Sequence, residues 1–381
     1  MKNIVAIDMR YVENLFSGLS RFSINIFYNL IKNSINDDIY FIILLPPKHI
    51  AKDLNLFNDL DLRKTKIFYS NNKRGLRWKI PFFILDLSLY LKLRSENVDI
   101  FLSPYIDPPI LPGIRVICTI HDLIFIRVKT YFNNLRILKR LVSEFRILLT
   151  LLYSNNILAV SETTKILLIN RYKYVSFIQK KLNNITVIYN GVTQFTTSNR
   201  LFKNKLFNLQ NDYILYVGDR RQHKNLFYTI ELVKKYNETY NKNYNLIIAG
   251  SASYKNYNLQ KFITSNPFVI EIRNPNDELL DYLYNNCISL MLLSFDEGFG
   301  IPIIEAASRS KKVVLSNIDV FKEIAPKNSL ILNLRKENQH VKLLHDYINK
   351  EIKVDPQTIF DKWSWEHSSF KLKKLLLSHL S

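Results

Sequence analysis

Short apolar runs alternate with more polar segments along most of the chain. The runs that are bounded by turn-forming residues cover 4–7, 40–45, 115–120, 156–160, 185–189, 213–217, 245–249, 287–293 and 313–316. Runs of this length predict buried strands, and the segments between them, such as 23–32 and 135–153, are long enough for helices. Strands that alternate with helices predict parallel sheets with helices on both faces. The pattern therefore indicates an α/β fold.

The chain divides at a polar segment, residues 193–211, which is rich in Ser, Thr, Asn and Lys. The turn signal Asn190-Gly191 precedes this segment, and a new strand pattern follows it. With 381 residues, of which 47% are hydrophobic, the chain is long enough for two domains that each bury a core. We therefore predict one domain over 1–192, a linker over 193–211 and a second domain over 212–362.

The most informative stretch is SFDEGFGIPIIEAA, residues 294–307. It follows the apolar run 287–293 and contains a glycine bend, after which Pro302 fits the first turn of a helix. A strand, a glycine turn and a helix N-terminus together present backbone N–H groups to an anion or a sugar hydroxyl. Glu297 at the end of the strand and Glu305 early in the helix are expected to face one cleft.

Further polar residues lie where predicted strands end. His121 follows such a strand, at the edge where ligands bind in open α/β sheets, although a histidine there can equally be hydrogen-bonded structure. Arg220, Arg221 and Lys224 precede a predicted helix, where fixed charges and the helix dipole suit a diphosphate; a solvated loop explains this cluster equally well. Gly18 allows either close approach to a phosphate or a plain tight turn.

The chain is strongly basic, because 53 Lys and Arg oppose 33 Asp and Glu and give a net charge of +20. Residues 1–200 carry a net charge of +14, so most of the excess lies in the first half. An excess of this kind indicates an anionic partner, either a nucleic acid or an acidic membrane surface.

The cysteines and the hydropathy pattern bear on the location of the protein. Cys118 and Cys287 lie in apolar runs, and we interpret them as buried thiols, which fits a reducing cytoplasm. The first strand meets Asp8 at once and does not resemble a signal peptide. No apolar run reaches the roughly 20 residues of a spanning helix, so any membrane contact is expected to be peripheral.

Basic and aromatic residues are interleaved over 63–79, ahead of the apolar run 80–85. Cations beside aromatic side chains suit an anionic lipid surface, to which each nearby cation contributes about 1 kcal/mol. A solvated basic loop is an equally good interpretation. The helix 135–153 repeats the pattern and is either a docking surface or ordinary domain packing. The candidate membrane contacts are Lys73, Arg74, Arg77, Lys79, Arg136, Lys139 and Arg140.

Taken in order, the motifs resemble those of retaining glycosyltransferases of the GT-B fold, family 4. The most specific match is the paired-glutamate signature formed by Glu297-Gly298-Phe299-Gly300, Pro302 and Glu305. Weaker matches occur at Ser17 to Phe22, His121-Asp122-Leu123, Val160-Ser161-Glu162, Tyr189 to Val192, Val217-Gly218, His223-Lys224-Asn225 and Trp363 to Glu366. The resemblance implies two Rossmann-like domains with parallel sheets facing across a cleft. It also implies that a C-terminal helix, at about 363–381, crosses back to the N-terminal, acceptor-binding domain.

The resemblance further implies a role for each motif. Glu305 accepts hydrogen bonds from the ribose of a nucleotide, and Glu297 with the amides of the glycine bend holds the donor sugar. Lys224 and one of the nearby arginines neutralise the leaving diphosphate, while His121 lies beside the reacting centre. The diphosphate itself takes the acceptor's proton on the same face of the sugar, so neither a protein nucleophile nor a metal is needed. The implied catalytic residues are Glu297 and His121, and the implied donor-binding residues are Gly18, Arg220, Arg221, Lys224, Gly298, Phe299, Gly300, Ile301 and Glu305.

The chain departs from the family's pattern at two positions. Ser20 stands where a second glycine is often found, and the residue before Lys224 is His223 rather than the usual arginine. Which of Arg220 and Arg221 binds the diphosphate is therefore left open.

The opening Ile7-Asp8-Met9-Arg10 and the turn His223-Lys224-Asn225 most resemble the mannosyltransferase-like branch that builds bacterial surface polysaccharide, O-antigen or capsule. The resemblance implies a GDP-mannose donor, with a UDP sugar as the alternative, and a glycan acceptor that is lipid-linked. It also implies a cytoplasmic enzyme attached peripherally to the anionic inner face of the membrane, with no nucleic-acid partner. A basic nucleic-acid-binding protein, and a GT-B relative that epimerises or phosphorylyses a sugar, are the competing hypotheses.

Overall fold

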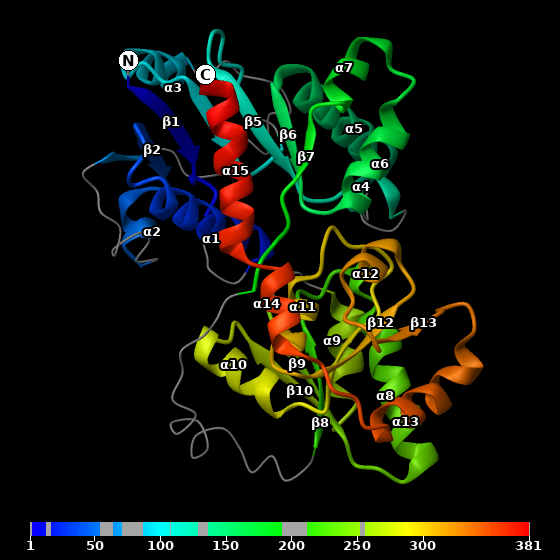
Figure 1. The fold of residues 1–381 in the computed structure, drawn as a ribbon. Helices are drawn as coiled ribbons and strands as arrows, with labels where there is room; N and C mark the ends of the chain where they lie inside the picture. The colour runs from blue at the N-terminus through cyan, green and yellow to red at the C-terminus, as the bar shows by residue number, and fades with distance from the viewer. Residues whose placement is uncertain are drawn as a thin grey trace. The chain divides into compact units, whose positions relative to one another are not determined.

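The computed structural model describes residues 2–12, 17–53, 64–70, 87–106, 108–128, 136–192, 212–251 and 256–380 (Figure 1). The chain forms two compact units, Met1–Asn190 with Ser364–Ser381, and Gly191–Trp363. In the described part of each unit, one sheet is built from strands that all pair in parallel. The α/β prediction is confirmed, and the predicted linker, 193–211, lies outside the described residues.

The sheet of the first unit has seven strands in the order β3-β2-β1-β4-β5-β6-β7. The strands are β1 (Asn3–Asp8), β2 (Ile39–Leu45), β3 (Thr65–Tyr69), β4 (Ile100–Ser103), β5 (Arg115–Ile120), β6 (Asn156–Ala159) and β7 (Ile185–Val187). The central strands are almost continuously buried, as is usual for parallel strands covered on both faces. Their mostly apolar sequences are typical of strands in this environment.

The sequence predicts one basic segment over residues 63–79, but part of this segment forms the edge strand β3. Thr65–Tyr69 instead pairs with β2. The strand is only partly buried, so it lacks the continuous apolar run by which buried strands are found. Residues 71–79 of the basic segment lie outside the described residues.

The helices of the first unit connect these strands. They are α1 (Gly18–Asn33), α2 (Lys48–Asp53), α3 (Leu87–Ser95), α4 (Ile124–Arg127), α5 (Arg136–Tyr153), α6 (Glu162–Tyr172), α7 (Gln179–Leu182) and α15 (Trp365–Leu380), with a 3₁₀ turn η2 (Ser176–Ile178). Helix α1 begins at Gly18 rather than at Ser23 as predicted. The cause is an N-cap, because Ser17 Oγ accepts a hydrogen bond from the Ser20 amide at 3.0 Å.

The C-terminal helix α15 belongs to the first unit, as the resemblance implied, and packs beside α1 (Figure 1). Leu372 and Leu376 of α15 are fully buried. Polar contacts join the same two helices, because Asn33 Nδ2 donates to Ser369 Oγ at 2.8 Å and Lys373 Nζ donates to the Asn33 carbonyl at 2.7 Å. The last helix is therefore part of the core of the domain in which the chain begins.

The sheet of the second unit has the order β10-β9-β8-β11-β12-β13. Its strands are β8 (Tyr213–Val217), β9 (Asn245–Gly250), β10 (Val269–Arg273), β11 (Ser289–Leu292), β12 (Lys312–Ser316) and β13 (Leu330–Leu332). From β8 the chain builds outward to β10 and then returns to place β11 on the other side of β8. Such a reversal of strand order opens a crevice at the carboxyl ends of the two strands, where ligands bind in α/β folds.

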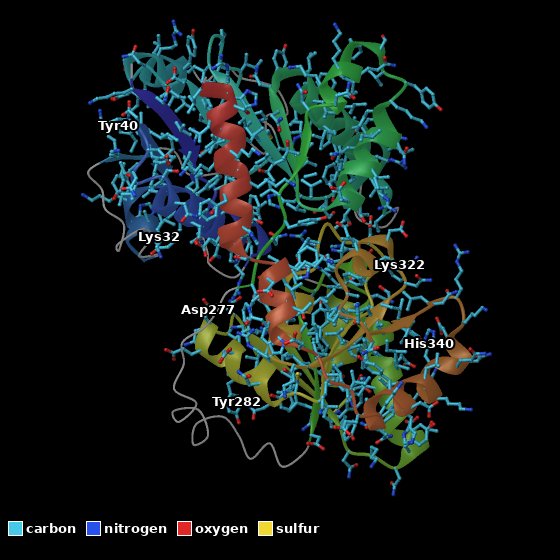
Figure 2. The ribbon with its side chains drawn as sticks, viewed as in Figure 1. Lys32, Tyr40, Asp277, Tyr282, Lys322 and His340 are labelled. Atoms are coloured by element: carbon cyan, nitrogen blue, oxygen red, sulfur yellow. The ribbon has the colours of Figure 1, made fainter. Side chains whose placement is uncertain are left out.

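The helices of the second unit are α8 (Leu226–Tyr240), α9 (Tyr257–Thr264), α10 (Asp277–Asn286), α11 (Ile301–Ala307), α12 (Asp319–Ile324), α13 (His340–Asn349) and α14 (Pro356–Lys362). The short turns η3 (Gln222–Lys224) and η4 (Glu337–Gln339) are 3₁₀. His340, labelled in Figure 2, begins α13 and holds it to α8 through its Nδ1, which lies 2.5 Å from the Tyr228 hydroxyl. Cys118 and Cys287 are buried free thiols, as predicted.

Candidate active site

Two loops meet at the carboxyl edge of the second sheet. One is the turn 218–225 after β8, and the other is the loop 293–300 after β11, which is the neighbour of β8. A backbone hydrogen bond joins them directly, because the Phe295 amide donates to the His223 carbonyl at 2.8 Å. The Asn225 side chain also donates to the Leu293 carbonyl at 3.0 Å. The structure therefore brings together the cationic turn and the glutamate loop that the sequence placed separately.

Lys224 and Glu297 form an ion pair at this junction. Lys224 Nζ lies 2.7 Å from Glu297 Oε1 and 2.8 Å from Oε2. Ser294 Oγ donates to the same Oε1 at 2.7 Å, so the carboxylate is held from two sides. The Lys224 and Glu297 side chains are 19% and 9% exposed, respectively. A fixed cation and a fixed carboxylate are thus kept at the carboxyl edge of the sheet.

The protonation of this cluster follows from its charges. Burial by itself would lower the pKa of the Lys224 ammonium, but the Glu297 and Asp219 carboxylates outweigh burial and raise that pKa. Burial would likewise raise the pKa of the Asp219 carboxyl, but Lys224 and Arg221 lower it below its usual value. Both groups are therefore charged at neutral pH. Arg221 Nε lies 2.9 Å from Asp219 Oδ2, and its side chain is 48% exposed.

Arg220 is placed very differently from Arg221. Its guanidinium turns into the protein and is 4% exposed. Nη1 donates to the carbonyls of Gly218 at 3.1 Å and Ser251 at 3.0 Å, while Nη2 donates to the Ile248 carbonyl at 3.2 Å. Nε donates to Glu271 Oε1 at 3.3 Å. These bonds fix the ends of β8 and β9, and of the two arginines it is Arg221 whose side chain is exposed at the turn.

The glutamate loop leads into helix α11 through a bend at Gly300. The helix starts at Ile301 with Pro302 in its first turn, as predicted. Gly300 precedes it at a φ of +114°, and a Cβ there would lie 3.0 Å from the Ile303 side chain and 3.1 Å from that of Phe321. Only glycine accepts this backbone angle without strain. The bend between Glu297 and α11 therefore depends on this glycine.

The remaining residues of the signature differ in burial. Gly298 and Ile301 are partly buried, and Phe299 is 4% exposed and packs edge-on against Trp363 at a centroid distance of 5.6 Å. The Glu305 side chain is 2% exposed. Its Oε2 accepts a hydrogen bond from the Tyr284 hydroxyl at 2.7 Å. Glu297 and Glu305 therefore have different hydrogen-bond partners.

His121 lies in the first unit, at the carboxyl end of β5. Its Nε2 is 2.8 Å from the Pro104 carbonyl, and Phe22 of α1 packs edge-on against the ring. Because a carbonyl can only accept, we assign the proton to Nε2, which leaves Nδ1 as a hydrogen-bond acceptor. Burial lowers the pKa of the imidazole to about 4, although the bond to Pro104 acts in the opposite direction. His121 is therefore neutral at physiological pH.

This depressed pKa predicts a pH-dependent loss of stability. In the unfolded chain His121 has its ordinary pKa of about 6.5, so the unfolded state binds the proton first as pH falls. The free energy of unfolding is therefore unaffected by protonation of His121 above pH 6.5 and falls as pH decreases from 6.5 toward 4. The total decrease due to His121 is about 2 to 3 kcal/mol. We expect His121→Asn to lose less unfolding free energy than the wild type between pH 7.5 and 4.5 in urea titrations. Equal losses in both proteins would contradict the assignment of the shift to His121.

Gly18 is the first residue of α1, and it is exposed. Ser20, the departure from the glycine pattern, is buried, and its Oγ accepts a hydrogen bond from Ser17 Oγ at 2.9 Å. The Ser20 side chain thus contacts the N-cap residue of its own helix.

The candidate membrane contacts are only partly described. Lys73, Arg74, Arg77 and Lys79 lie outside the described residues, as does the side chain of Arg136. Lys139 and Arg140 are exposed on α5. Arg140 Nε lies 3.5 Å from Glu144 Oε1, an exposed contact of little energetic weight.

Sequence reasoning missed several residues that hold the site together. Asp219, Ser294 and Tyr284 contact the predicted site residues directly. In the first unit, Arg10 forms a two-point ion pair with Asp8 at the carboxyl end of β1, with distances of 2.7 and 2.8 Å. Ser294 lies within the predicted stretch 294–307, and Asp219 directly precedes the predicted cations, so both could have been assigned to the site. Tyr284 carried no such signal, because it lies on a separate helix.

Comparisons with known proteins agree with this architecture. A model described as Glycosyltransferase Family 4 matches residues 51–193, and one described as Glycosyl transferases group 1 matches residues 197–356. The O-antigen chain mannosyltransferase RfbU of Salmonella typhimurium is 26% identical over 263 residues, 68% of this chain and 67% of RfbU. The serotype-specific mannosyltransferase WbdA of Escherichia coli is 31% identical over 145 residues, 36% of this chain but only 17% of WbdA.

A solved structure shares the fold across the whole chain. The crystal structure of a glycosyltransferase from Rickettsia africae has a TM-score of 0.68 at 18% identity, and the match covers 100% of this chain and 99% of that one. The family models, the relatives and this fold lead to one assignment. The chain belongs to family 4 of the glycosyltransferases and has the GT-B fold.

Proposed function

We propose that the chain transfers a mannosyl group, with retention of configuration, from GDP-mannose to a lipid-linked glycan during O-antigen or capsule synthesis. The donor sugar is suggested by the relatives RfbU and WbdA, both of which are named mannosyltransferases. The observation that carries the transferase chemistry is the Lys224–Glu297 pair at the carboxyl ends of β8 and β11. A UDP sugar as donor is the alternative.

The geometry supports a catalytic role for fixed charge. A leaving diphosphate gains negative charge as the glycosidic bond breaks, and a preorganised cation stabilises that charge without reorganisation. Lys224 is kept protonated and oriented by Glu297, and the exposed Arg221 lies on the same turn. In the proposed reaction these two cations meet the diphosphate, and no metal is required. Glu297, held by Ser294, is assigned to the donor sugar.

The state of His121 fits a role in binding rather than in proton transfer. Its pKa of about 4 makes the ring a poor general acid at neutral pH. The neutral ring can accept a hydrogen bond at Nδ1 while Nε2 is engaged by Pro104. We assign it to a hydroxyl of the transferred sugar, and we assign the acceptor's proton to the departing diphosphate.

A nucleotide screen tests this function. Thermal shift with GDP, UDP, ADP and their sugars should show stabilisation by GDP and GDP-mannose, of about 2.7 kcal/mol at a concentration of 100 times Kd. Transfer of labelled mannose to a lipid-linked acceptor should give a product with retained configuration. Glu305→Ala should abolish most of the nucleotide-induced shift. Unchanged nucleotide affinity in that variant would overturn the assignment, and a shift with UDP alone would select the alternative donor.

We further propose that α5 attaches the protein to an anionic membrane surface. Its exposed face carries an apolar patch whose spacing follows one side of a helix. The patch consists of Ile137 (79% exposed), Leu138 (57%), Leu141 (60%) and Phe145 (43%). Lys139 and Arg140 lie exposed beside the patch. Apolar side chains flanked by cations suit an acidic lipid interface. The apolar side chains enter the boundary of the acyl chains, and the cations meet the charges of the headgroups.

We propose lipid as the partner of the exposed face of α5, because of the basic charge of this part of the chain and the proposed lipid-linked acceptor. The first 200 residues carry +14, which complements an anionic surface, and a lipid-linked acceptor is presented at such a surface. Every helix within the described ranges falls short of the length and apolarity that a bilayer crossing requires. Surface attachment by a patch of this size is expected to be reversible.

Replacing Ile137 and Leu141 together by serine is expected to weaken binding to vesicles that contain phosphatidylglycerol by at least about tenfold, because each residue loses burial in the interface. Flotation with phosphatidylethanolamine–phosphatidylglycerol vesicles measures this loss. Tyr257→Ser removes an equally exposed side chain, 81% accessible, from α9 of the other unit and serves as the control. If the double variant floats as well as the wild type, α5 is not the attachment face.

A further inference from the structure

Glu305 receives a hydrogen bond from a tyrosine outside the paired-glutamate loop. Tyr284 lies on α10 and is fully buried, and its hydroxyl donates to Glu305 Oε2 at 2.7 Å. A phenol has one proton to donate, and in this structure that proton is directed at the carboxylate. The bond therefore constrains how the carboxylate of Glu305 is turned about its last torsion.

A second set of contacts holds Tyr284 itself. The guanidinium carbon of Arg309 lies 5.3 Å from the centroid of the Tyr284 ring, within the range of a favourable cation–π contact. The same guanidinium donates to Asp281 Oδ1 at 2.7 Å and to the Glu305 carbonyl at 2.8 Å. Asp281 and Tyr284 are both on α10. Arg309 therefore fastens α10 to α11 at the residue that carries the carboxylate.

The charged groups of this network are buried. Asp281 and Glu305 are 6% and 2% exposed, and the Arg309 side chain is 9% exposed. Charged groups this far from water keep a fixed geometry only when their hydrogen bonds are satisfied. The Glu305 carboxylate is thus anchored to a rigid network and does not sample many orientations.

We propose that Tyr284 is a positioning residue for nucleotide recognition, which orients Glu305 so that its carboxylate meets the two vicinal hydroxyls of the ribose together. This inference rests on the proposed role of Glu305. A carboxylate has about four acceptor sites, so the bond from Tyr284 leaves acceptor capacity for a ligand. A side chain that is already oriented also loses less rotamer freedom when the ligand binds.

The proposal makes a prediction that a structural role alone does not make. If Tyr284 acts through the ribose hydroxyls, its phenol hydroxyl affects the affinity only for nucleotides that carry ribose hydroxyls. Tyr284→Phe keeps the ring and its contact with Arg309, and it removes the hydroxyl that donates to Glu305. The variant should therefore weaken binding of a ribonucleotide and leave binding of the matching dideoxynucleotide unchanged.

Isothermal titration calorimetry of the full chain with GDP and with 2′,3′-dideoxy-GDP tests this prediction. If the nucleotide screen selects UDP, the corresponding uridine nucleotides are used instead. We expect Tyr284→Phe to bind GDP about tenfold more weakly, the size of one hydrogen bond to a charged group. The affinity for dideoxy-GDP should change by less than about twofold. Equal weakening for both nucleotides would overturn the proposal.

Two further variants separate the possible failures. Tyr213→Phe removes another buried phenol hydroxyl that holds α10, because Tyr213 donates to the Leu283 carbonyl at 2.9 Å. It should lower the melting temperature without affecting the preference for GDP over dideoxy-GDP, and a loss of that preference would count against the proposal. If Glu305→Ala leaves GDP affinity unchanged, the proposed function is wrong. If Glu305→Ala weakens GDP binding and Tyr284→Phe does not, only this inference is wrong.

Discussion

Replacing Lys224 by methionine is expected to lower the kcat of sugar transfer by about 10²- to 10³-fold, the usual effect of removing one preorganised stabiliser of transition-state charge. Methionine keeps the unbranched apolar stem of the side chain and removes the ammonium. That ammonium is 2.7 Å from Glu297, and the surrounding carboxylates raise its pKa, so the wild-type site always presents a cation. Initial rates with labelled GDP-mannose, fitted for kcat and KM separately, measure the effect.

Stability must be measured alongside activity in this variant. Lys224→Met leaves Glu297 without its cation at 9% exposure, and an unpaired carboxylate this buried is destabilising. Adding Glu297→Gln removes the stranded charge and should recover part of the melting temperature while transfer stays low. Lys235→Met, on the exposed side of α8, is the matched control and should leave both quantities unchanged. If Lys224→Met keeps kcat within a few-fold of the wild type, the cation is not catalytic.

The strands of this protein could be predicted because burial and sequence are tightly linked in parallel sheets. The predicted bounds of β5 and β8 agree with the structure, since each of these strands is a largely buried, mostly apolar run. Four strands of the described residues were not predicted. Strands β3, β10 and β13 lie at sheet edges and are only partly buried, whereas β4 is central and fully buried but only four residues long. Apolar runs therefore locate a parallel strand when it is both well buried and long enough to form a recognisable run.

Side-chain partners could be predicted only where they lie close in sequence. Ser161 caps α6 and Asn276 caps α10, and caps of this kind can be recognised in a sequence because each contacts an amide three residues away. The bond between Tyr284 and Glu305 spans two elements, and it depends on how α10 crosses α11. The bond between Lys224 and Glu297 spans two loops, and it depends on β8 pairing with β11. Strand order is the information that the sequence pattern lacks.

The pair Arg220 and Arg221 illustrates the same limit on a smaller scale. Adjacent arginines in a polar turn have the same composition, charge and distance from the strand, so sequence reasoning left both as candidates for the diphosphate. The turn after β8 directs the first toward β9 and Glu271 and leaves the second exposed. Backbone geometry alone separates a structural arginine from a candidate ligand-binding one.

Opposite outcomes are therefore expected for the two arginines. Arg220→Met removes the donors to three backbone carbonyls and to Glu271, and we expect it to lower the free energy of unfolding by about 3 to 5 kcal/mol, since buried acceptors are left unsatisfied. Arg221→Met changes an exposed side chain and should alter that free energy by no more than about 0.5 kcal/mol. In urea titrations, equal destabilisation by the two substitutions would contradict the structural role of Arg220.

Nucleotide affinity should separate the two residues in the reverse order. Arg221 adds a second cation near Lys224, so Arg221→Met is expected to weaken GDP binding by about tenfold, and the loss should shrink at high salt because an exposed charge is screened. Arg220→Lys keeps a charge at the buried site but cannot reproduce the fork of donors. That variant should remain destabilised while the folded fraction binds GDP normally. A buried guanidinium that ties two strand ends together holds the turn, and the exposed guanidinium beside it is the candidate for binding a diphosphate.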